Sequence, residues 1–201
     1  MSGTAGDFSA HLETAESLIG IILGARGTGK SAIGMRLLEN VHARAGRAVC
    51  AMGFRAEDVP AWIQVVEDPD KVPNGACVLI DEGGVLFSSR KSMSGANQLL
   101  SSLLLVARHR SLSILFITQN SSNLDVNVLR QADFLVLKPC SLLQLDFERK
   151  KIKDLYAQVA GDFERLKEEL GLTYIHSDPF RGFAANDLPG FWSARVSRAF
   201  R

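Results

Sequence analysis

The amino-acid sequence predicts an α/β fold in which a mostly parallel sheet is flanked by helices. Short, continuous apolar runs alternate along the chain with longer segments of helical periodicity, as buried parallel strands alternate with their crossover helices. Two of these runs end in a glycine-rich loop and in a pair of carboxylates, so polar groups gather at one edge of the sheet. With 201 residues, 46% of them apolar, the chain suits one globular domain.

The first apolar run, residues 18–23, leads into a glycine-rich loop. From Gly24 to Ser31 the sequence reads G-x-x-x-x-G-K-S, a Walker A motif between a predicted strand and a predicted helix over residues 30–44. Its backbone N–H groups would surround the β-phosphate of a nucleotide, Lys30 would reach the β- and γ-phosphates, and Ser31 would hold Mg²⁺. The predicted nucleotide-binding residues are Gly24, Ala25, Arg26, Gly27, Thr28, Gly29, Lys30, Ser31 and Ala32.

A strand at 47–52 and a short strand or connection at 62–66 precede a second motif. After the turn signal Pro73-Asn74-Gly75, residues 76–80 form an apolar strand that ends in Asp81 and Glu82, as in a Walker B element. Asp81 would hold the magnesium ion through its water shell, and Glu82 would polarise the attacking water as general base. The alternative for Glu82 is a solvated residue at the end of a strand.

A third group of polar residues surrounds the next strand. Residues 94–107 have helical spacing, Arg108-His109-Arg110 follow, and the apolar strand 112–118 ends in Thr118-Gln119. Glutamine both donates and accepts hydrogen bonds without acting as a base, so Gln119 is a candidate sensor of the γ-phosphate and its attacking water. In the stretch 88–95, Arg90 and Lys91 are candidate contacts to DNA phosphates, or else part of a solvated loop.

The remaining elements follow the same pattern. We expect a strand at 133–137, a helix at 148–170, a hairpin from 173–176 and 182–185, and a short helix at 191–200. The predicted organisation is therefore a flexible segment 1–16 and a single domain 17–201. Within that domain, residues 17–140 form the core and residues 141–201 a small C-terminal hairpin and helix extension.

Composition narrows the possible classes of protein. No apolar run approaches the roughly 20 residues of a membrane-spanning helix, and the N-terminus has no charged-then-apolar signal pattern. The three cysteines are widely spaced and indicate neither disulfides nor a zinc site. A net charge of +1 neither requires nor excludes nucleic acid.

The order of these motifs resembles that of the FtsK–HerA superfamily of additional-strand ATPases. Its members carry Walker A, a Walker B ending in Asp-Glu, an arginine before the next strand and a glutamine at that strand's end, and all four occur here within residues 17–140. The resemblance implies a RecA-like domain that binds ATP and Mg²⁺ and assembles into a homo-oligomeric ring, usually a hexamer, acting on double-stranded DNA. In size the chain is most similar to the small genome-packaging ATPases of membrane-containing viruses.

That resemblance carries further expectations. It implies sequence-nonspecific contact with DNA, docking to a capsid or membrane vertex protein, and a cytoplasmic or virion-associated location. Arg108 matches the arginine of the superfamily pattern and would act in trans, on the nucleotide of a neighbouring subunit. Arg110 is the second choice, and a charge at the end of a helix is the alternative for Arg108.

Two other functions are compatible with the motifs. The segment from Arg108 to Gln119 is also similar to that of Zot-like assembly ATPases of filamentous phages, which would use ATP to order partners without pumping DNA. A small P-loop kinase would need an arginine-rich lid, yet Arg130 is the only arginine between the sensor strand and Arg149. Stimulation of ATP hydrolysis by DNA would distinguish a DNA-translocating ATPase from an assembly ATPase. The preference for ATP over other nucleotides is implied only by the resemblance.

Overall fold

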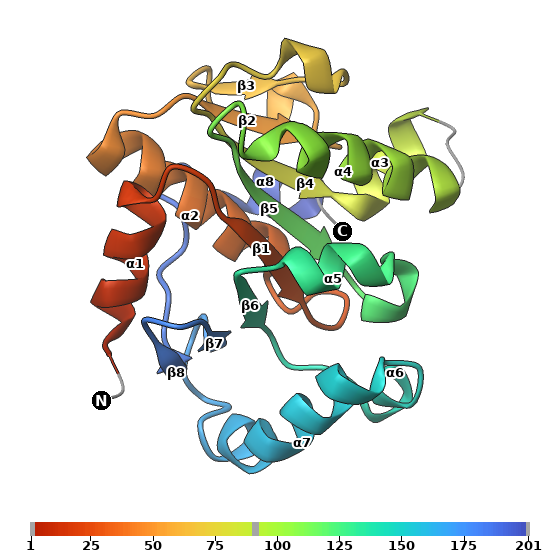
Figure 1. Cartoon of the computed structure of the whole chain (residues 1–201). Helices are drawn as coiled ribbons and strands as arrows, with labels where there is room; N and C mark the ends of the chain where they lie inside the picture. Colours follow the sequence, from red (N-terminus) through yellow and green to blue (C-terminus); the bar gives the residue numbers. More distant parts are fainter. Residues whose placement is uncertain (1–2, 90–92, 200–201) are drawn as a thin grey trace.

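A computed structural model describes residues 3–89 and 93–199 (Figure 1). Its centre is one sheet of eight strands in the order β3-β2-β4-β5-β1-β6-β7-β8. The first six strands in this order pair in parallel, and β7 and β8 are antiparallel. The strands are β1 Ile19–Leu23, β2 Val49–Met52, β3 Ile63–Val65, β4 Cys77–Asp81, β5 Ser113–Thr118, β6 Phe134–Leu137, β7 Thr173–His176 and β8 Arg181–Ala184. The mostly parallel sheet predicted from the sequence is confirmed.

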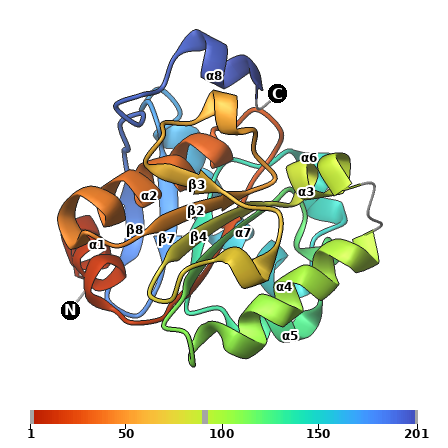
Figure 2. The same ribbon diagram turned by 90° about the horizontal axis from the view of Figure 1, so that it is seen from above.

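Helices cover both faces of this sheet, as Figure 2 shows from above. They are α1 Ala5–Thr14, α2 Lys30–Ala45, α3 Glu82–Ser89, α4 Met93–Ala107, α5 Val126–Gln131, α6 Leu142–Asp146, α7 Lys150–Arg165 and α8 Ala194–Ala199, with short 3₁₀ turns at η1 Ala56–Asp58, η2 Pro69–Lys71 and η3 Ser121–Asn123. α1 and α2 pack on one face of the sheet, whereas α3, α4, α5 and α7 pack on the other. Because both faces are covered, every residue of β1, β2 and β5 is buried, which explains their continuous apolar runs.

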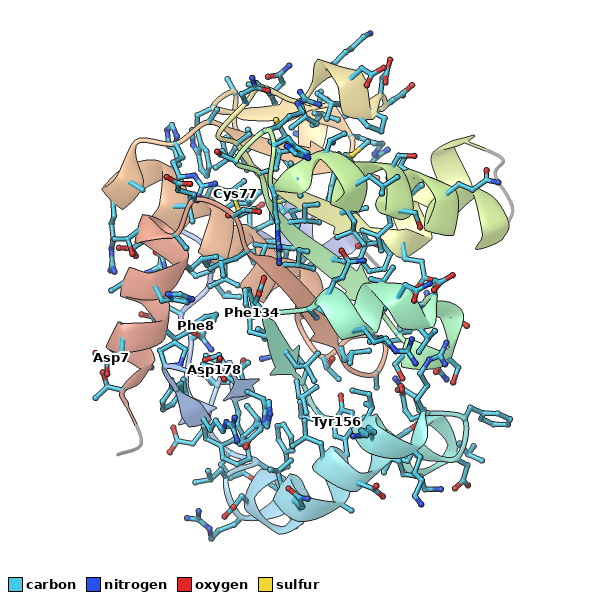
Figure 3. All side chains as sticks on the ribbon, in the orientation of Figure 1. Asp7, Phe8, Cys77, Phe134, Tyr156 and Asp178 are labelled. Atoms are coloured by element: carbon cyan, nitrogen blue, oxygen red, sulfur yellow. The ribbon has the colours of Figure 1, made fainter. Side chains whose placement is uncertain are left out.

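The prediction of a flexible segment 1–16 is wrong for residues 5–14, which form α1. Thr4 caps this helix, because its hydroxyl accepts a hydrogen bond from the Asp7 N–H and the Asp7 carboxylate accepts one from the Thr4 N–H. Phe8 and Leu12 are buried one helical turn apart, and the Phe8 ring meets Phe134 of β6 edge-to-face at 5.0 Å (Figure 3). A helix of ten residues with two apolar anchors is too short for its periodicity to stand out in the sequence.

Three short helices, α3, α5 and α6, were also not predicted, and α7 ends at Arg165 rather than at residue 170. α3 could not be predicted because Gly83 and Gly84, which have low helix propensity, lie in its first turn. A Cβ atom at Gly84 would lie 1.8 Å from the Gly53 carbonyl oxygen, so close backbone packing requires glycine there. The predicted hairpin at the C-terminal end is confirmed as β7 and β8, which extend the sheet beyond β6.

Two expectations from composition can be compared with the structure. All three cysteines are free, Cys50 and Cys77 buried and Cys140 partly buried. Across residues 3–89 and 93–199, none of the helices has both the length and the apolar character needed to cross a bilayer.

Candidate nucleotide-binding site

The Walker A loop joins the end of β1 to the start of α2, at the carboxyl edge of the parallel strands. Gly27 and Gly29 have φ values of 79° and 89°, in the left-handed region that favours glycine. Gly29 is also the N-cap of α2 and has no side chain with which to cap the first turn. The N–H groups of that turn and the helix dipole therefore form a site that favours a negatively charged ligand.

Lys30 lies within this loop and is 8% exposed. Its Nζ atom donates hydrogen bonds to the carbonyl oxygens of Gly24 (2.9 Å) and Ala25 (2.8 Å), so the side chain is held against the loop. Burial lowers the pKa of Lys30, and the nearby carboxylates of Asp81 and Glu82 act in the opposite direction. A phosphate group bound in the loop would give the ammonium group a stronger partner than two neutral carbonyls.

Ser31 and Asp81 come from different motifs but meet at the same place. The Ser31 hydroxyl donates to Asp81 Oδ2 at 3.3 Å, and Asp81 Oδ1 accepts hydrogen bonds from the N–H groups of Gly83 (3.0 Å) and Gly84 (3.3 Å). Hydroxyl and carboxylate oxygens are the ligands that Mg²⁺ prefers, and adjacent ligands of an octahedral Mg²⁺ ion lie about 3 Å apart. These two residues therefore fit a magnesium ion or its inner water shell.

Glu82 follows Asp81 and begins α3. It is 6% exposed, so it is not a solvated residue at the end of a strand. Burial raises the pKa of its carboxyl group, and hydrogen bonds from Thr118 and Asn123 oppose that rise. The Thr118 hydroxyl donates to Glu82 Oε2 at 2.5 Å. Glu82 is thus a buried carboxylate fixed by the neighbouring strand, beside the residues that would hold the metal.

The sheet order places β5 between the two motif-bearing strands. In the registers on either side, Leu23 of β1 pairs with Thr118, and Asp81 of β4 pairs with Ile117. The strand that carries Thr118 and Gln119 at its end is therefore inserted between Walker A and Walker B. One strand thus separates the strand before the Walker A loop from the strand that ends in Asp81.

Gln119 is exposed at this edge of the sheet, but Thr118 is the residue that contacts Glu82. The Gln119 carbonyl accepts a hydrogen bond from the Gln144 side chain of α6. The sequence places Thr118 beside Gln119 at the tip of this strand, but it indicates a role only for Gln119. A hydroxyl at the end of a strand next to Walker B is the signal that could have identified Thr118.

The two candidate trans-acting arginines lie at the opposite edge of the sheet. Both precede β5, whose first residue, Ser113, pairs with Cys77 at the start of β4. Arg110 donates hydrogen bonds to Asn74 Oδ1 (2.9 Å) and the Pro69 carbonyl (3.3 Å), and also to the carbonyl of Val72. Its guanidinium group is therefore used to hold the loop before β4.

Arg108 is exposed. Its carbonyl accepts a hydrogen bond from the Ser111 N–H (3.3 Å), and its guanidinium group has no hydrogen-bond partner in the described part of the chain. Since it lies at the amino end of β5, it is remote from the Walker residues of its own chain at the carboxyl end. At this position Arg108 cannot act on the nucleotide of its own chain, and it also fits the alternative of a charge at the end of α4. The two candidate DNA contacts, Arg90 and Lys91, fall outside the described residues.

A cavity of about 600 Å³ opens beside the Walker A loop. Gly27, Thr28 and Gly29 form one part of its wall, and residues of α7 and of the segment 186–188 form another. This second wall belongs to the C-terminal extension, to which the sequence had assigned no site. The cavity is continuous with the phosphate-binding loop, so a bound nucleotide would reach into it.

Lys138 connects the two walls of this cavity. It is 4% exposed, follows β6, and its Nζ atom donates to the Gly171 carbonyl (3.0 Å), the Leu172 carbonyl (2.7 Å) and Thr173 Oγ1 (3.0 Å). Burial lowers the pKa of Lys138 to about 8. Because all three donors of the ammonium group have acceptors, Lys138 fixes the entry to β7 beside the Walker A loop.

Comparisons with known proteins agree with this architecture. No family model matches the sequence, and no curated protein is significantly similar to it. Among solved structures, the genome-packaging NTPase B204 from Sulfolobus turreted icosahedral virus 2, in complex with ATP-γS, is similar with a TM-score of 0.58 and 17% identity, covering 86% of this chain and 98% of that one. The DNA-packaging ATPase B204 from Sulfolobus turreted icosahedral virus gives a TM-score of 0.58 and 16% identity, covering 88% and 99%. At these identities the likeness establishes a shared fold, that of a P-loop NTPase.

Proposed function

We propose that this chain is an ATP-hydrolysing motor that assembles into a ring and packages double-stranded viral or mobile-element DNA. The observation that carries the proposal is the convergence of Lys30, Ser31, Asp81 and Glu82 on one sheet edge, with the sensor strand inserted between them. The shared fold with packaging NTPases, over 98% and 99% of those chains, supports the choice of this function among P-loop proteins.

The proposed reaction is an in-line hydrolysis of ATP, in which each of these residues has a role. Backbone N–H groups of the Walker A loop and Lys30 bind and orient the β- and γ-phosphates, while Ser31 and Asp81 would hold Mg²⁺. When bound, Mg²⁺ neutralises charge on the phosphate oxygens. Glu82 accepts the proton of the attacking water, and Gln119 orients that water and the γ-phosphate at the tip of β5. Arg108 of a neighbouring subunit stabilises the negative charge that develops on the γ-phosphoryl group.

The partners follow from the same proposal. If each site uses Arg108 from the sheet edge of a neighbouring copy, the protein must be a homo-oligomer, and we propose a hexamer. For such a packaging motor we also propose docking to a capsid or membrane vertex protein and a cytoplasmic or virion-associated location. The alternative, a Zot-like ATPase that orders assembly partners, keeps the same nucleotide site but dispenses with DNA.

Lys30→Ala is expected to weaken the binding of ATP. When nucleotide binds, the Lys30 ammonium group is expected to donate to phosphate oxygens instead of to the two loop carbonyls, and alanine cannot do so. Charge-assisted hydrogen bonds of this kind are worth about 1.5–3 kcal/mol each. We therefore expect the Kd for a slowly hydrolysed ATP analogue to rise at least tenfold in equilibrium titrations. Lys71→Ala removes one exposed lysine far from the loop and serves as the control. Unchanged affinity in the Lys30 variant would show that nucleotide binds elsewhere.

Double-stranded DNA is expected to stimulate ATP hydrolysis, regardless of its sequence. Because contacts to phosphates release counterions, DNA affinity should fall at least tenfold between 50 and 200 mM salt. The double variant Arg90→Ala, Lys91→Ala should bind DNA more weakly and with a shallower salt dependence. Lys150→Ala, Lys151→Ala removes the same charge from exposed positions at the start of α7. If DNA changes neither turnover nor any binding signal, the assembly ATPase is the better reading.

A further inference from the structure

The end of β5 continues directly into a short segment that carries two groups of the proposed site. This sensor segment runs from Gln119 to Asn123 and includes the 3₁₀ turn η3. Gln119 is the residue proposed to orient water and the γ-phosphate, and Asn123 donates a hydrogen bond to the Glu82 carboxylate. Thr118, immediately before the segment, donates to the same carboxylate. The orientation of the proposed base therefore depends on where the sensor segment lies.

A buried carboxylate from the C-terminal extension holds this segment. Glu148 lies between α6 and α7 and is 7% exposed. Its Oε2 atom accepts a hydrogen bond from the Ser121 N–H at 3.0 Å and another from the Ser121 hydroxyl. Ser121 is buried as well, so water cannot replace the carboxylate as the acceptor of these two donors. The two residues thus join the tip of β5 to the corner between α6 and α7.

Neighbouring residues of that corner strengthen the contact. The Arg149 guanidinium group donates to the carbonyls of Ser121 (3.0 Å) and Leu124 (2.5 Å), and the Arg149 N–H donates to the Ser121 hydroxyl oxygen at 3.3 Å. The Ser122 hydroxyl donates to the Phe147 carbonyl. Because Ser121 begins η3 and Leu124 follows it, the corner holds both ends of this turn.

The burial of Glu148 is only partly compensated. One carboxylate oxygen has two donors, but Glu148 Oε1 is buried without a hydrogen-bond partner across residues 3–89 and 93–199. A well-packed apolar pair would join the same two segments without the cost of desolvating a charge. What the hydrogen bonds add is direction, because they fix the orientation of the Ser121 backbone as well as its distance. This arrangement favours precise placement of the sensor segment over maximum stability.

We propose that Glu148 is a positioning residue for ATP hydrolysis. It holds the sensor segment where Asn123 meets Glu82 and where Gln119 faces the γ-phosphate. The proposal rests on the proposed ATPase function, and it assigns the corner between α6 and α7 a part in the rate. A misplacement of about 1 Å in an active site can cost roughly 10²-fold in rate, whereas the phosphates are bound by a different loop. Loss of Glu148 should therefore lower kcat and leave nucleotide affinity unchanged.

The test replaces Glu148 with a side chain of similar size that cannot accept a hydrogen bond. Glu148→Leu should lower kcat for ATP hydrolysis with Mg²⁺ by about ten- to a hundredfold, with unchanged KM and unchanged Kd for ATP-γS. Glu148→Gln keeps an oxygen that can accept from both Ser121 donors and should retain most of kcat. Glu13→Leu is the matched control, because the Glu13 side chain is 16% exposed and binds Arg44, at the opposite end of α2 from the Walker A loop.

A double variant distinguishes positioning from a general loss of stability. Asn123→Ala removes a donor to Glu82 at the end of the sensor segment and should also lower kcat. If Glu148 acts through this segment, adding Glu148→Leu to Asn123→Ala should cost little more than the larger of the two single losses. Thermal unfolding of every variant is recorded beside its kcat, and Glu13→Leu shows what a loss of stability alone does to turnover.

Ser121→Ala tests the same bond from its other partner and keeps the proposal falsifiable if Glu148→Leu does not fold. It removes the hydroxyl donor and should lower kcat at unchanged KM. If neither variant lowers kcat, if the losses multiply in the double variant, or if kcat falls only together with ATP-γS affinity, the positioning proposal is overturned while the ATPase function stands. An unmodified chain that binds ATP-γS but does not hydrolyse ATP would overturn the proposed function, and this proposal with it.

Discussion

Glu82→Gln is expected to bind ATP with unchanged affinity and to hydrolyse it at least a hundredfold more slowly. The substitution keeps the size of the side chain and an oxygen that can accept the Thr118 hydrogen bond, but an amide cannot take a proton from water. General-base catalysis contributes about 10² to 10⁴ in rate, which sets the expected loss of kcat. Single-turnover hydrolysis and equilibrium binding of the same preparation separate the two effects.

Glu67→Gln is the control for this experiment, because Glu67 is an exposed glutamate outside the site. It should hydrolyse ATP at the original rate. Thr118→Val adds a second comparison, since valine has nearly the shape of threonine but cannot donate to Glu82. Full activity in Glu82→Gln would remove Glu82 from the mechanism, whereas slow hydrolysis accompanied by lost binding would point to damage at the metal site.

Arg108→Ala is expected to bind ATP normally and to lose a factor of about 10³ to 10⁵ in kcat, the range known for arginine fingers. The reason is its location, at the edge of the sheet opposite the Walker residues of its own chain. His109→Ala alters the next exposed residue and should retain activity. Arg110→Ala has a different expected effect, because it releases the loop at Pro69, Val72 and Asn74 and lowers the free energy of unfolding.

Mixing two inactive variants tests whether Arg108 acts across an interface. Arg108→Ala subunits retain Glu82, and Glu82→Gln subunits retain Arg108, so a mixed ring contains complete sites where the first lies next to the second. Hydrolysis should return as the two are combined and pass through a maximum with their ratio. Mixtures that stay inactive, from a chain that sediments as a monomer, would rule out both the trans-acting arginine and the ring.

The parts of the site that depend on local sequence were predictable. Walker A, Walker B and the strands that carry them are short segments in which residue type and spacing determine the conformation. Their convergence also followed from the rule that parallel strands share a carboxyl edge. The hydrogen bond between Thr118 and Glu82 could not be predicted, because it depends on which strand lies next to β4 and in which register.

Contacts between distant segments explain the other omissions. α1 owes its stability to Phe8 and Leu12 packing on the sheet and α2, and such packing leaves little trace in ten residues of sequence. The cavity beside the Walker A loop could not be predicted, because its lining comes from the loop, from α7 and from residues 186–188, which lie far apart in the sequence. The hydrogen bonds that hold Arg110 to the loop before β4 likewise could not be predicted, because they join residues 36 to 41 positions apart in the sequence.

The insertion of β5 between β1 and β4 also determines how the site can deform. Neighbouring strands lie about 4.8 Å apart because backbone hydrogen bonds fix that spacing, so the phosphate loop and the acidic pair are separated by roughly two such intervals. The site is therefore stiff across the strands and compliant only at its edge, where η3, α6 and the loops begin. In the proposed motor, mechanical work would therefore leave the molecule through these edge segments, because spreading the sheet would break both hydrogen-bonded ladders of β5 at once.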